Sequence, residues 1–83
     1  MKYVIVYDVP AETHSKIYAL LKRKMFWVQN SVFENELSEA EFKSLWQNLS
    51  KLDIEGLKIR CYMSPTMQTY TLGYESDPTS PIL

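Results

Sequence analysis

The sequence has very little of several residue types, and each shortage excludes a class of protein. Its single cysteine, Cys61, cannot form a disulfide within the chain, which excludes a disulfide-stapled secreted domain and favours a reducing, cytoplasmic setting. Two glycines and four prolines among 83 residues exclude a collagen-like or low-complexity chain. The apolar run near the start ends at Asp8, too early for a signal-peptide core or a membrane span, so no membrane partner is expected.

Excess positive charge is also missing. Nine Lys and Arg residues stand against ten Asp and Glu residues, which gives a formal net charge of −1. A free-standing nucleic-acid-binding protein usually has a basic balance, so any contact with nucleic acid must come from a local patch or through a partner. The chain also has no CxxC, HExxH, P-loop or GxGxxG motif, which excludes the common zinc, nucleotide-triphosphate and dinucleotide sites.

Hydrophobic periodicity and turn residues predict the elements of the chain. The run at 3–7 is typical of a strand buried on both faces, and the turn within the β-prone stretch 26–37 falls either at Asn30-Ser31 or at Asn35. In chain order, the elements are a strand at 3–7, an amphipathic helix at 11–24, a hairpin or bent strand at 26–37, a helix from the capping box of Ser38 and Glu41 to 52, a strand at 57–63 and a short strand at 69–74.

The order β-α-β(β)-α-β-β, with right-handed crossovers, places both helices on one face of a single sheet. This is the ferredoxin-like, split βαβ arrangement of an α+β protein, here with an extra C-terminal strand. We expect a domain at residues 1–76 and a flexible tail at 77–83. Because a chain of this length is marginally stable alone and one sheet face is bare, a homodimer is expected.

Asp8 is the candidate with the clearest chemistry, because it follows the first strand directly. A carboxylate there can hold a divalent ion, and Mg²⁺ is typically bound by one or two carboxylates together with phosphate. A two-fold dimer supplies the second carboxylate, and the ion can then activate water against a phosphodiester. The structural alternative is that Asp8 caps the following helix. We expect His14 to face solvent and Cys61 to be a packing residue.

The only basic cluster lies at the end of the first predicted helix. The cluster is Lys22-Arg23-Lys24, with Lys16 earlier in the helix, and it either neutralises phosphates or forms a solvated helix end. Ser31 and Phe33 lie in the β-prone stretch, where Phe33 is more typical of a core residue than of a platform for base stacking.

Three segments of this chain resemble a known family. The first is Tyr3-Val4-Ile5-Val6-Tyr7-Asp8-Val9. The second is Leu20-Leu21-Lys22-Arg23 followed by Trp27-Val28-Gln29-Asn30-Ser31-Val32-Phe33-Glu34-Asn35-Glu36-Leu37-Ser38, and the third is Thr71-Leu72-Gly73. The family is the second of the two universal CRISPR-associated adaptation proteins, the small ferredoxin-like subunit that works with the CRISPR integrase during spacer acquisition. The resemblance covers nearly the whole chain in order.

The resemblance implies a homodimer whose last strand crosses to the partner's sheet and whose two Asp8 residues face each other at Mg²⁺, with Mn²⁺ as an alternative. It implies a metal-dependent endonuclease that acts on single-stranded RNA or double-stranded DNA, and a dimer that bridges integrase subunits and contacts spacer DNA. Asp8 is then both catalytic residue and metal ligand. The residues expected to contact nucleic acid or to shape the cleft are Lys16, Lys22, Arg23, Ser31 and Phe33.

Two alternatives stay open. One is a catalytically inactive, architectural adaptor, in which residues 69–83 dock the integrase and Asp8 is a helix cap. The other is a toxin-like ribonuclease that shares the fold. Some family members carry arginines where this chain has residues such as Ser15, Ile17 and Trp27, which weakens phosphate binding here.

Overall fold

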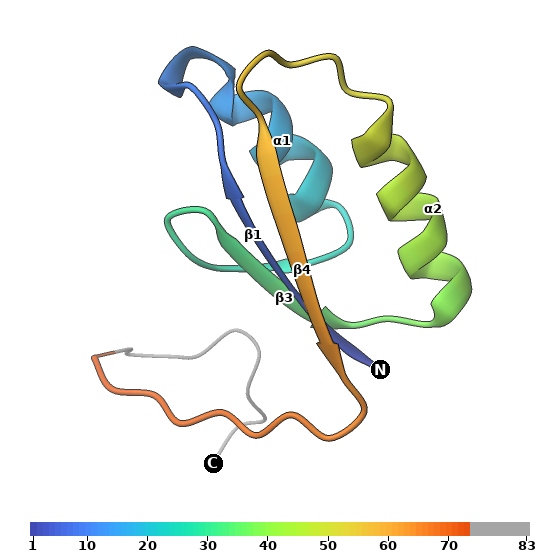
Figure 1. Ribbon diagram of the computed structural model, residues 1–83. Coiled ribbons are helices and arrows are strands. Elements are labelled where there is room, and N and C mark those ends of the chain that lie inside the picture. Colours follow the sequence, from blue (N-terminus) through green and yellow to red (C-terminus); the bar gives the residue numbers. More distant parts are fainter. Residues whose placement is uncertain (74–83) are drawn as a thin grey trace.

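The apolar run at the start of the chain forms the central strand of the protein. In the computed structural model, which describes residues 1–73, β1 (Lys2–Asp8) pairs antiparallel with β3 (Val32–Glu36) on one side and with β4 (Lys58–Ser64) on the other. β2 (Phe26–Gln29) pairs with β3, which gives a four-stranded sheet of order β2-β3-β1-β4. Figure 1 shows β1 and β4 side by side through the middle of the molecule.

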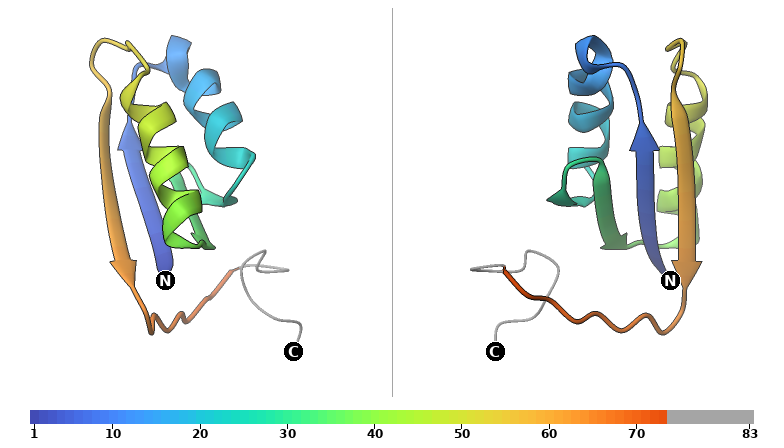
Figure 2. Two further views of the ribbon diagram at one scale, coloured as in Figure 1. Left: turned by 90° about the vertical axis from the view of Figure 1, so that its right-hand side faces the viewer. Right: turned by 60° about the vertical axis from the view of Figure 1, so that its left-hand side comes forward.

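Two helices cover one face of this sheet. A 3₁₀ turn, η1 (Ala11–Thr13), leads into α1 (His14–Lys22), and α2 (Glu39–Ser50) follows β3. Both helices lie on the same side of the strands (Figure 2). The element order and strand order are those of the ferredoxin-like α+β fold, which confirms the predicted fold class. Neither helix within residues 1–73 is long and apolar enough to span a bilayer.

The two faces of β1 have different surroundings. Tyr3, Ile5 and Tyr7 point toward the helices and are 4%, 0% and 6% exposed, whereas Val4 and Val6 on the opposite face are only half-buried. The prediction of a strand buried on both faces is therefore wrong for the single chain, because helices cover only one side of the sheet.

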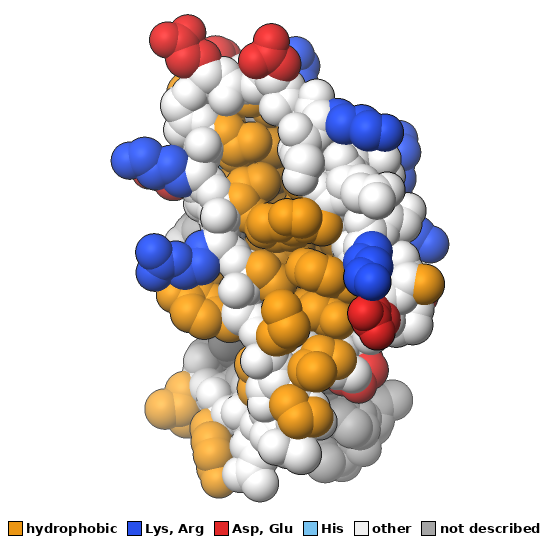
Figure 3. Space-filling model, turned by 45° about the vertical axis from the view of Figure 1, so that its right-hand side comes forward, with side chains coloured by type: hydrophobic (Ala, Val, Ile, Leu, Met, Phe, Trp, Pro, Cys, Tyr) orange, Lys and Arg blue, Asp and Glu red, His pale blue; other side chains and the backbone are white. Residues whose placement is uncertain are grey.

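The core lies between the helices and the covered sheet face. The Phe33 ring, the Ile17 side chain and the Leu21 side chain are fully buried there. The Tyr3 ring is stacked on the Phe42 ring of α2, with centroids 4.1 Å apart. Between β4 and α2 an apolar strip stays visible at the surface, with Lys and Arg side chains along its sides (Figure 3).

The turn that the sequence left open lies at Asn30-Ser31, and Asn35 belongs to β3. Asn30 has φ = 41°, in the left-handed region that asparagine tolerates better than most residues. The Trp27 indole Nε1 donates to the Asn30 carbonyl oxygen at 2.9 Å and closes the turn. The stretch 26–37 is therefore a hairpin.

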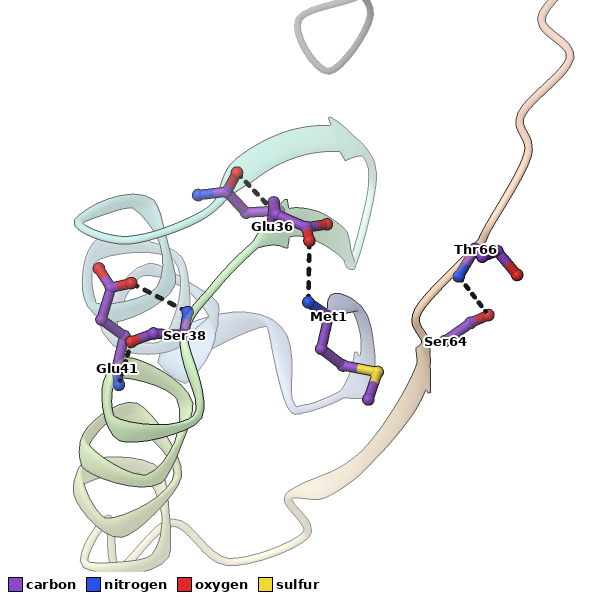
Figure 4. Close-up of polar contacts among 7 residues, drawn as sticks. Met1, Glu36, Ser38, Glu41, Ser64 and Thr66 are labelled. Atoms are coloured by element: carbon purple, nitrogen blue, oxygen red, sulfur yellow. Dashed lines mark hydrogen bonds and ion pairs between the residues drawn. The ribbon is translucent and has the colours of Figure 1, made fainter.

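The predicted capping box at the start of α2 is confirmed. The Glu41 backbone N–H donates to Ser38 Oγ at 3.1 Å, and the Ser38 N–H donates to Glu41 Oε1 at 3.0 Å (Figure 4). The hydrogen bond from the Ser38 backbone N–H, with a smaller contribution from the Ser38 side chain, holds the pKa of the Glu41 carboxyl below its usual value. Since a lowered folded-state pKa stabilises the fold above the unfolded-state value, this contribution is present at neutral pH and is lost as pH falls through the lowered pKa.

Replacing Ser38 with alanine is expected to lower the free energy of unfolding by about 1 kcal/mol, because the substitution removes the acceptor for an otherwise unpaired helix N–H. Urea denaturation measures the change. Ser44→Ala, in the exposed middle of the same helix, is the matched control and should be neutral or slightly stabilising. Equal losses in both variants would show that the cap contributes nothing.

The predicted strand at 69–74 does not form within the described residues. After β4 the chain turns at Pro65-Thr66, and no strand is present between Met67 and Gly73. The Tyr70 and Leu72 side chains are 91% and 96% exposed, because the segment has no neighbouring strand to pair with in the single chain. The predicted domain end at 76 and the predicted tail at 77–83 lie outside the described residues.

Candidate functional site

Asp8 is the last residue of β1 and lies at one end of the sheet. The antiparallel pairing of β1 with both neighbours brings the Asn30-Ser31 turn and the start of β4 to this end, and α1 begins just beyond it. The Asp8 side chain is exposed, and it has no hydrogen bond or ion pair with any part of the chain that the structure describes. Its carboxylate is therefore available to a ligand.

The structure contradicts the alternative that Asp8 caps a helix. The N-cap residues of η1 and α1 are Pro10 and Thr13, and neither helix has a side-chain cap. The Thr13 hydroxyl instead donates to the Pro10 carbonyl oxygen at 3.0 Å. Pro10 lies between Asp8 and the first helical turn and lacks an N–H, so the carboxylate is left outside the helix.

A small polar cluster supports the strand just before Asp8. The Tyr7 N–H donates to the Ser31 carbonyl oxygen at 3.1 Å, and the Tyr7 hydroxyl shares a hydrogen bond of 3.0 Å with His14 Nε2. Burial raises the pKa of the Tyr7 hydroxyl, and the Ser31 side chain partly offsets this. The expectation that His14 faces solvent is wrong, because its ring is half-buried against the Tyr7 and Tyr18 rings.

A metal ion at this site would have one carboxylate ligand from this chain, that of Asp8. Within residues 1–73 there is no group of three or more His, Cys, Asp or Glu side chains placed to hold a metal. An exposed carboxylate without an ion pair is nevertheless the oxygen ligand that Mg²⁺ takes when substrate phosphate and water complete its shell. The residues present therefore fit an open Mg²⁺ site that phosphate and water complete, and they do not fit a closed protein cage.

The structure separates the predicted cationic residues. Lys16 is exposed in the first turns of α1, near the Asp8 end of the sheet. Lys22 and Arg23 are exposed at the other end of this helix, with Lys22 about 9 Å further along the axis than Lys16. The Lys22 ammonium lies 5.5 Å from the Tyr18 ring centroid. Of these three predicted cations, only Lys16 therefore lies toward the Asp8 end of the sheet.

Ser31 and Phe33, the two hairpin residues predicted to contact nucleic acid or shape the cleft, differ in solvent exposure. Ser31 is half-buried in the turn and contacts Tyr7, directly behind Asp8. Phe33 is 0% exposed, and its ring faces the Tyr7 and Tyr18 rings in the core. In this conformation the Phe33 ring has no surface on which a base can stack. Cys61 packs beside the core, and burial raises the pKa of its thiol, as expected for a packing residue.

The sequence reasoning missed two cations that lie next to Asp8. Lys58 is the direct cross-strand partner of Asp8, and Arg60 is the partner of Val6. Together they line a hollow of about 410 Å³ with Tyr62 and Asp8. The sequence shows that Lys58, Arg60 and Tyr62 alternate with apolar residues and therefore share one face of a strand. Only the β1–β4 register shows that this polar face lies beside Asp8.

The fold and this site define a class: small ferredoxin-like α+β proteins with an exposed carboxylate at the end of the central strand. The family model described as CRISPR associated protein Cas2 matches residues 1–70. The chain therefore belongs to the Cas2 family.

Individual relatives agree with this assignment. The CRISPR-associated endoribonuclease Cas2 of Pyrococcus furiosus is 38% identical over 85 aligned residues, which cover 100% of both chains. A crystal structure of a Cas2 protein superposes with a TM-score of 0.80 at 34% identity and covers 100% of this chain and 98% of that one. Streptococcus pyogenes Cas2 at pH 6.5 has a TM-score of 0.65 at 31% identity and covers 77% of this chain and 86% of that one.

Proposed function

We propose that this chain is a CRISPR adaptation subunit that acts as a homodimer and as a Mg²⁺-dependent endoribonuclease, with Asp8 as its metal ligand. The observation that carries the proposal is the free, exposed Asp8 carboxylate at the end of β1. This carboxylate belongs to a chain whose relatives over the full length are named CRISPR-associated endoribonucleases. In the same proposal the dimer bridges integrase subunits, contacts spacer DNA and works in the cytoplasm.

The proposed dimer rests on the sheet face that no helix covers. Val4 and Val6 of β1 are half-buried there, and Phe26 of β2 is 46% exposed. A two-fold interface through this face would bury those side chains. It would also bring the ends of the two β1 strands, one from each chain, into one assembly. The second Asp8 that a Mg²⁺ site needs would come from that copy.

The chain's own residues would prepare the reaction as follows. Asp8 would hold the ion at the strand end, while the hydrogen bonds of Tyr7 to Ser31 and His14 fix the strand behind it. Bound Mg²⁺ supplies a water of lowered pKa and neutralises charge that develops on the phosphate. Lys16 would add positive charge at the same end of the molecule.

One observation favours the alternative of a catalytically inactive, architectural adaptor. Tyr70 and Leu72 are almost fully exposed in a segment that leaves the sheet at the end opposite Asp8 (Figure 1). Large apolar side chains on an extended segment are typical of docking elements. In this alternative the segment would bind the integrase.

A cleavage assay tests the proposal. Purified protein is incubated with labelled single-stranded RNA or double-stranded DNA in Mg²⁺, in Mn²⁺ or in EDTA, and its mass is measured by light scattering. We expect a dimer that cuts RNA with either metal and not in EDTA. A well-folded dimer that cuts no nucleic acid would leave the adaptor alternative, and a monomer that cuts RNA would contradict the shared site.

A further inference from the structure

A second hollow lies in the helix layer, on the side of the molecule opposite the uncovered face of the sheet. It is formed where the C-terminal end of α1 lies beside α2, and both helices are seen side by side in Figure 2. Its volume of about 410 Å³ is large enough for side chains of a bound segment. The Leu20 side chain of α1 and the Leu45 side chain of α2 give it an apolar lining. We call this hollow the α1–α2 groove.

Two cations at the border of the α1–α2 groove have no acidic partner. Arg23 and Lys24 follow α1 directly and line the groove, and both side chains are exposed. None of the ion pairs within residues 1–73 involves either of them. Their neighbour Lys22 is directed elsewhere, because its ammonium lies 5.5 Å from the centroid of the Tyr18 ring. Arg23 and Lys24 therefore provide the positive charge of the groove.

The polar groups of the groove stand on a well-held backbone. The Asn35 amide Nδ2 donates to the Lys24 carbonyl oxygen at 2.7 Å, and the Met25 N–H donates to the Leu21 carbonyl oxygen at 2.9 Å, which fixes the turn after α1. On the α2 side, the Ser44 and Asn48 side chains line the groove and make no hydrogen bond within the described part of the chain. A hydroxyl and an amide are therefore available to a ligand.

The charge of the lining distinguishes between two classes of ligand. The Glu41 carboxylate also lines the groove, so the two cations and this carboxylate give a net charge of +1. A nucleic acid carries a charge at every phosphate, and its backbone would be repelled by Glu41. A polypeptide segment can instead place carboxylates at the two cations, an apolar side chain between the leucines and backbone groups at the free hydroxyl and amide. Charge complementarity therefore favours an acidic polypeptide.

We propose that the α1–α2 groove binds an acidic segment of a partner protein, with an apolar side chain of that segment between Leu20 and Leu45 and its carboxylates at Arg23 and Lys24. This inference rests on the proposed homodimer and deepens it by naming a surface for its partner. Because that dimer forms through the opposite face of the sheet, its two helix layers face outward, and each carries one groove. The dimer can therefore hold a partner molecule on each side, as a bridge requires.

Peptide binding tests the groove without any cleavage. The probe is a fluorescently labelled peptide with glutamates on both sides of one leucine, and fluorescence anisotropy measures its affinity for the full-length protein. An exposed charge pair contributes up to about fivefold in affinity, so Arg23→Gln combined with Lys24→Gln should bind the peptide about tenfold more weakly. A peptide with glutamine in place of each glutamate should bind the parent protein no better than the acidic peptide binds this double variant.

Two further variants make the result specific. Ser44→Tyr places a ring in the groove from an exposed position of α2 and should abolish binding. Lys43→Gln combined with Lys51→Gln removes the same charge as the double variant from positions that do not line the groove. Its affinity should stay within about twofold of the parent protein, because distant surface charges are screened by salt. Circular dichroism and light scattering measure the folding and the mass of each variant.

The outcomes separate this inference from the proposed activity. Weaker binding in both groove variants, with the control unchanged, supports the groove even if the protein cuts no RNA. Failure of the acidic peptide to bind the parent protein, unchanged binding in the groove variants or an equal loss in the control would overturn it, whether or not the protein is a nuclease. Loss of affinity for RNA or DNA in place of the peptide would assign the groove to nucleic acid, and a monomeric groove variant would assign it to a second copy; either result contradicts the inference.

Discussion

Replacing Asp8 with asparagine is expected to reduce Mg²⁺-dependent RNA cleavage by about 10³-fold. A bound metal ion contributes several kcal/mol of charge stabilisation in the transition state, and a loss of about 4 kcal/mol corresponds to about 10³-fold in rate. Because the Asp8 side chain is exposed and makes no hydrogen bond or ion pair within residues 1–73, the free energy of unfolding should change by less than about 0.5 kcal/mol. Initial cleavage rates and urea denaturation measure the two effects.

Asp53→Asn is the control for this substitution. Asp53 is also exposed, follows α2, and the change removes the same charge. Its cleavage rate should stay within about twofold of the parent protein, because surface charges outside a site act weakly in salt. Equal activity of the parent and Asp8→Asn proteins would place the chemistry elsewhere, and equal losses in both variants would point to net charge as the cause.

Replacing Phe33 with alanine is expected to destabilise the protein strongly. Phe33 is fully buried between the sheet and α1, and removing such a ring typically costs about 3–5 kcal/mol. A domain of 83 residues has a total stability of about 4–12 kcal/mol, so this loss is a large part of the whole. Circular dichroism during thermal unfolding would show a much lower midpoint or no transition.

Two companions keep the Phe33 experiment informative. Tyr70→Ala removes an aromatic side chain that is 91% exposed and should leave stability unchanged. Phe33→Leu keeps most of the volume, should cost less than about 1.5 kcal/mol and should stay folded. If the leucine variant binds RNA as the parent does, Phe33 acts through the core. A selective loss of RNA binding in a stable protein would instead restore its predicted contact with nucleic acid.

Local sequence patterns predicted the elements well because their causes are local. The capping box of Ser38 and Glu41 set the start of α2, and the Val- and Ile-rich run set β1. The prediction of a strand at 69–74 was wrong because its cause is not local. A strand is defined by its neighbour, and the segment beyond Met67 has none in the single chain. No local pattern shows whether a β-prone segment will find a pairing edge.

The residues of the candidate site also fall into two groups: those that local sequence predicts and those that only the strand pairing reveals. Asp8 stood out because it follows a strand directly, and its exposure agrees with that interpretation. Lys22 and Arg23 stood out because they are adjacent in sequence. They lie at the C-terminal end of α1, however, and the helix begins at the end of the sheet where Asp8 lies. Lys58 and Arg60 are fifty residues further along the chain and reach Asp8 only through the β1–β4 register, which a single sequence does not give.

The hydrogen bonds of Tyr7 have a consequence for binding entropy. Its backbone N–H donates to the carbonyl oxygen of Ser31 in the β2–β3 turn, and its hydroxyl is hydrogen-bonded to His14 of α1, so three elements are held together immediately behind Asp8. The conformational freedom of this strand end is therefore lost during folding, before any ligand arrives. A carboxylate on such a support is preorganised, so little of the binding free energy of metal and RNA is spent on ordering the protein.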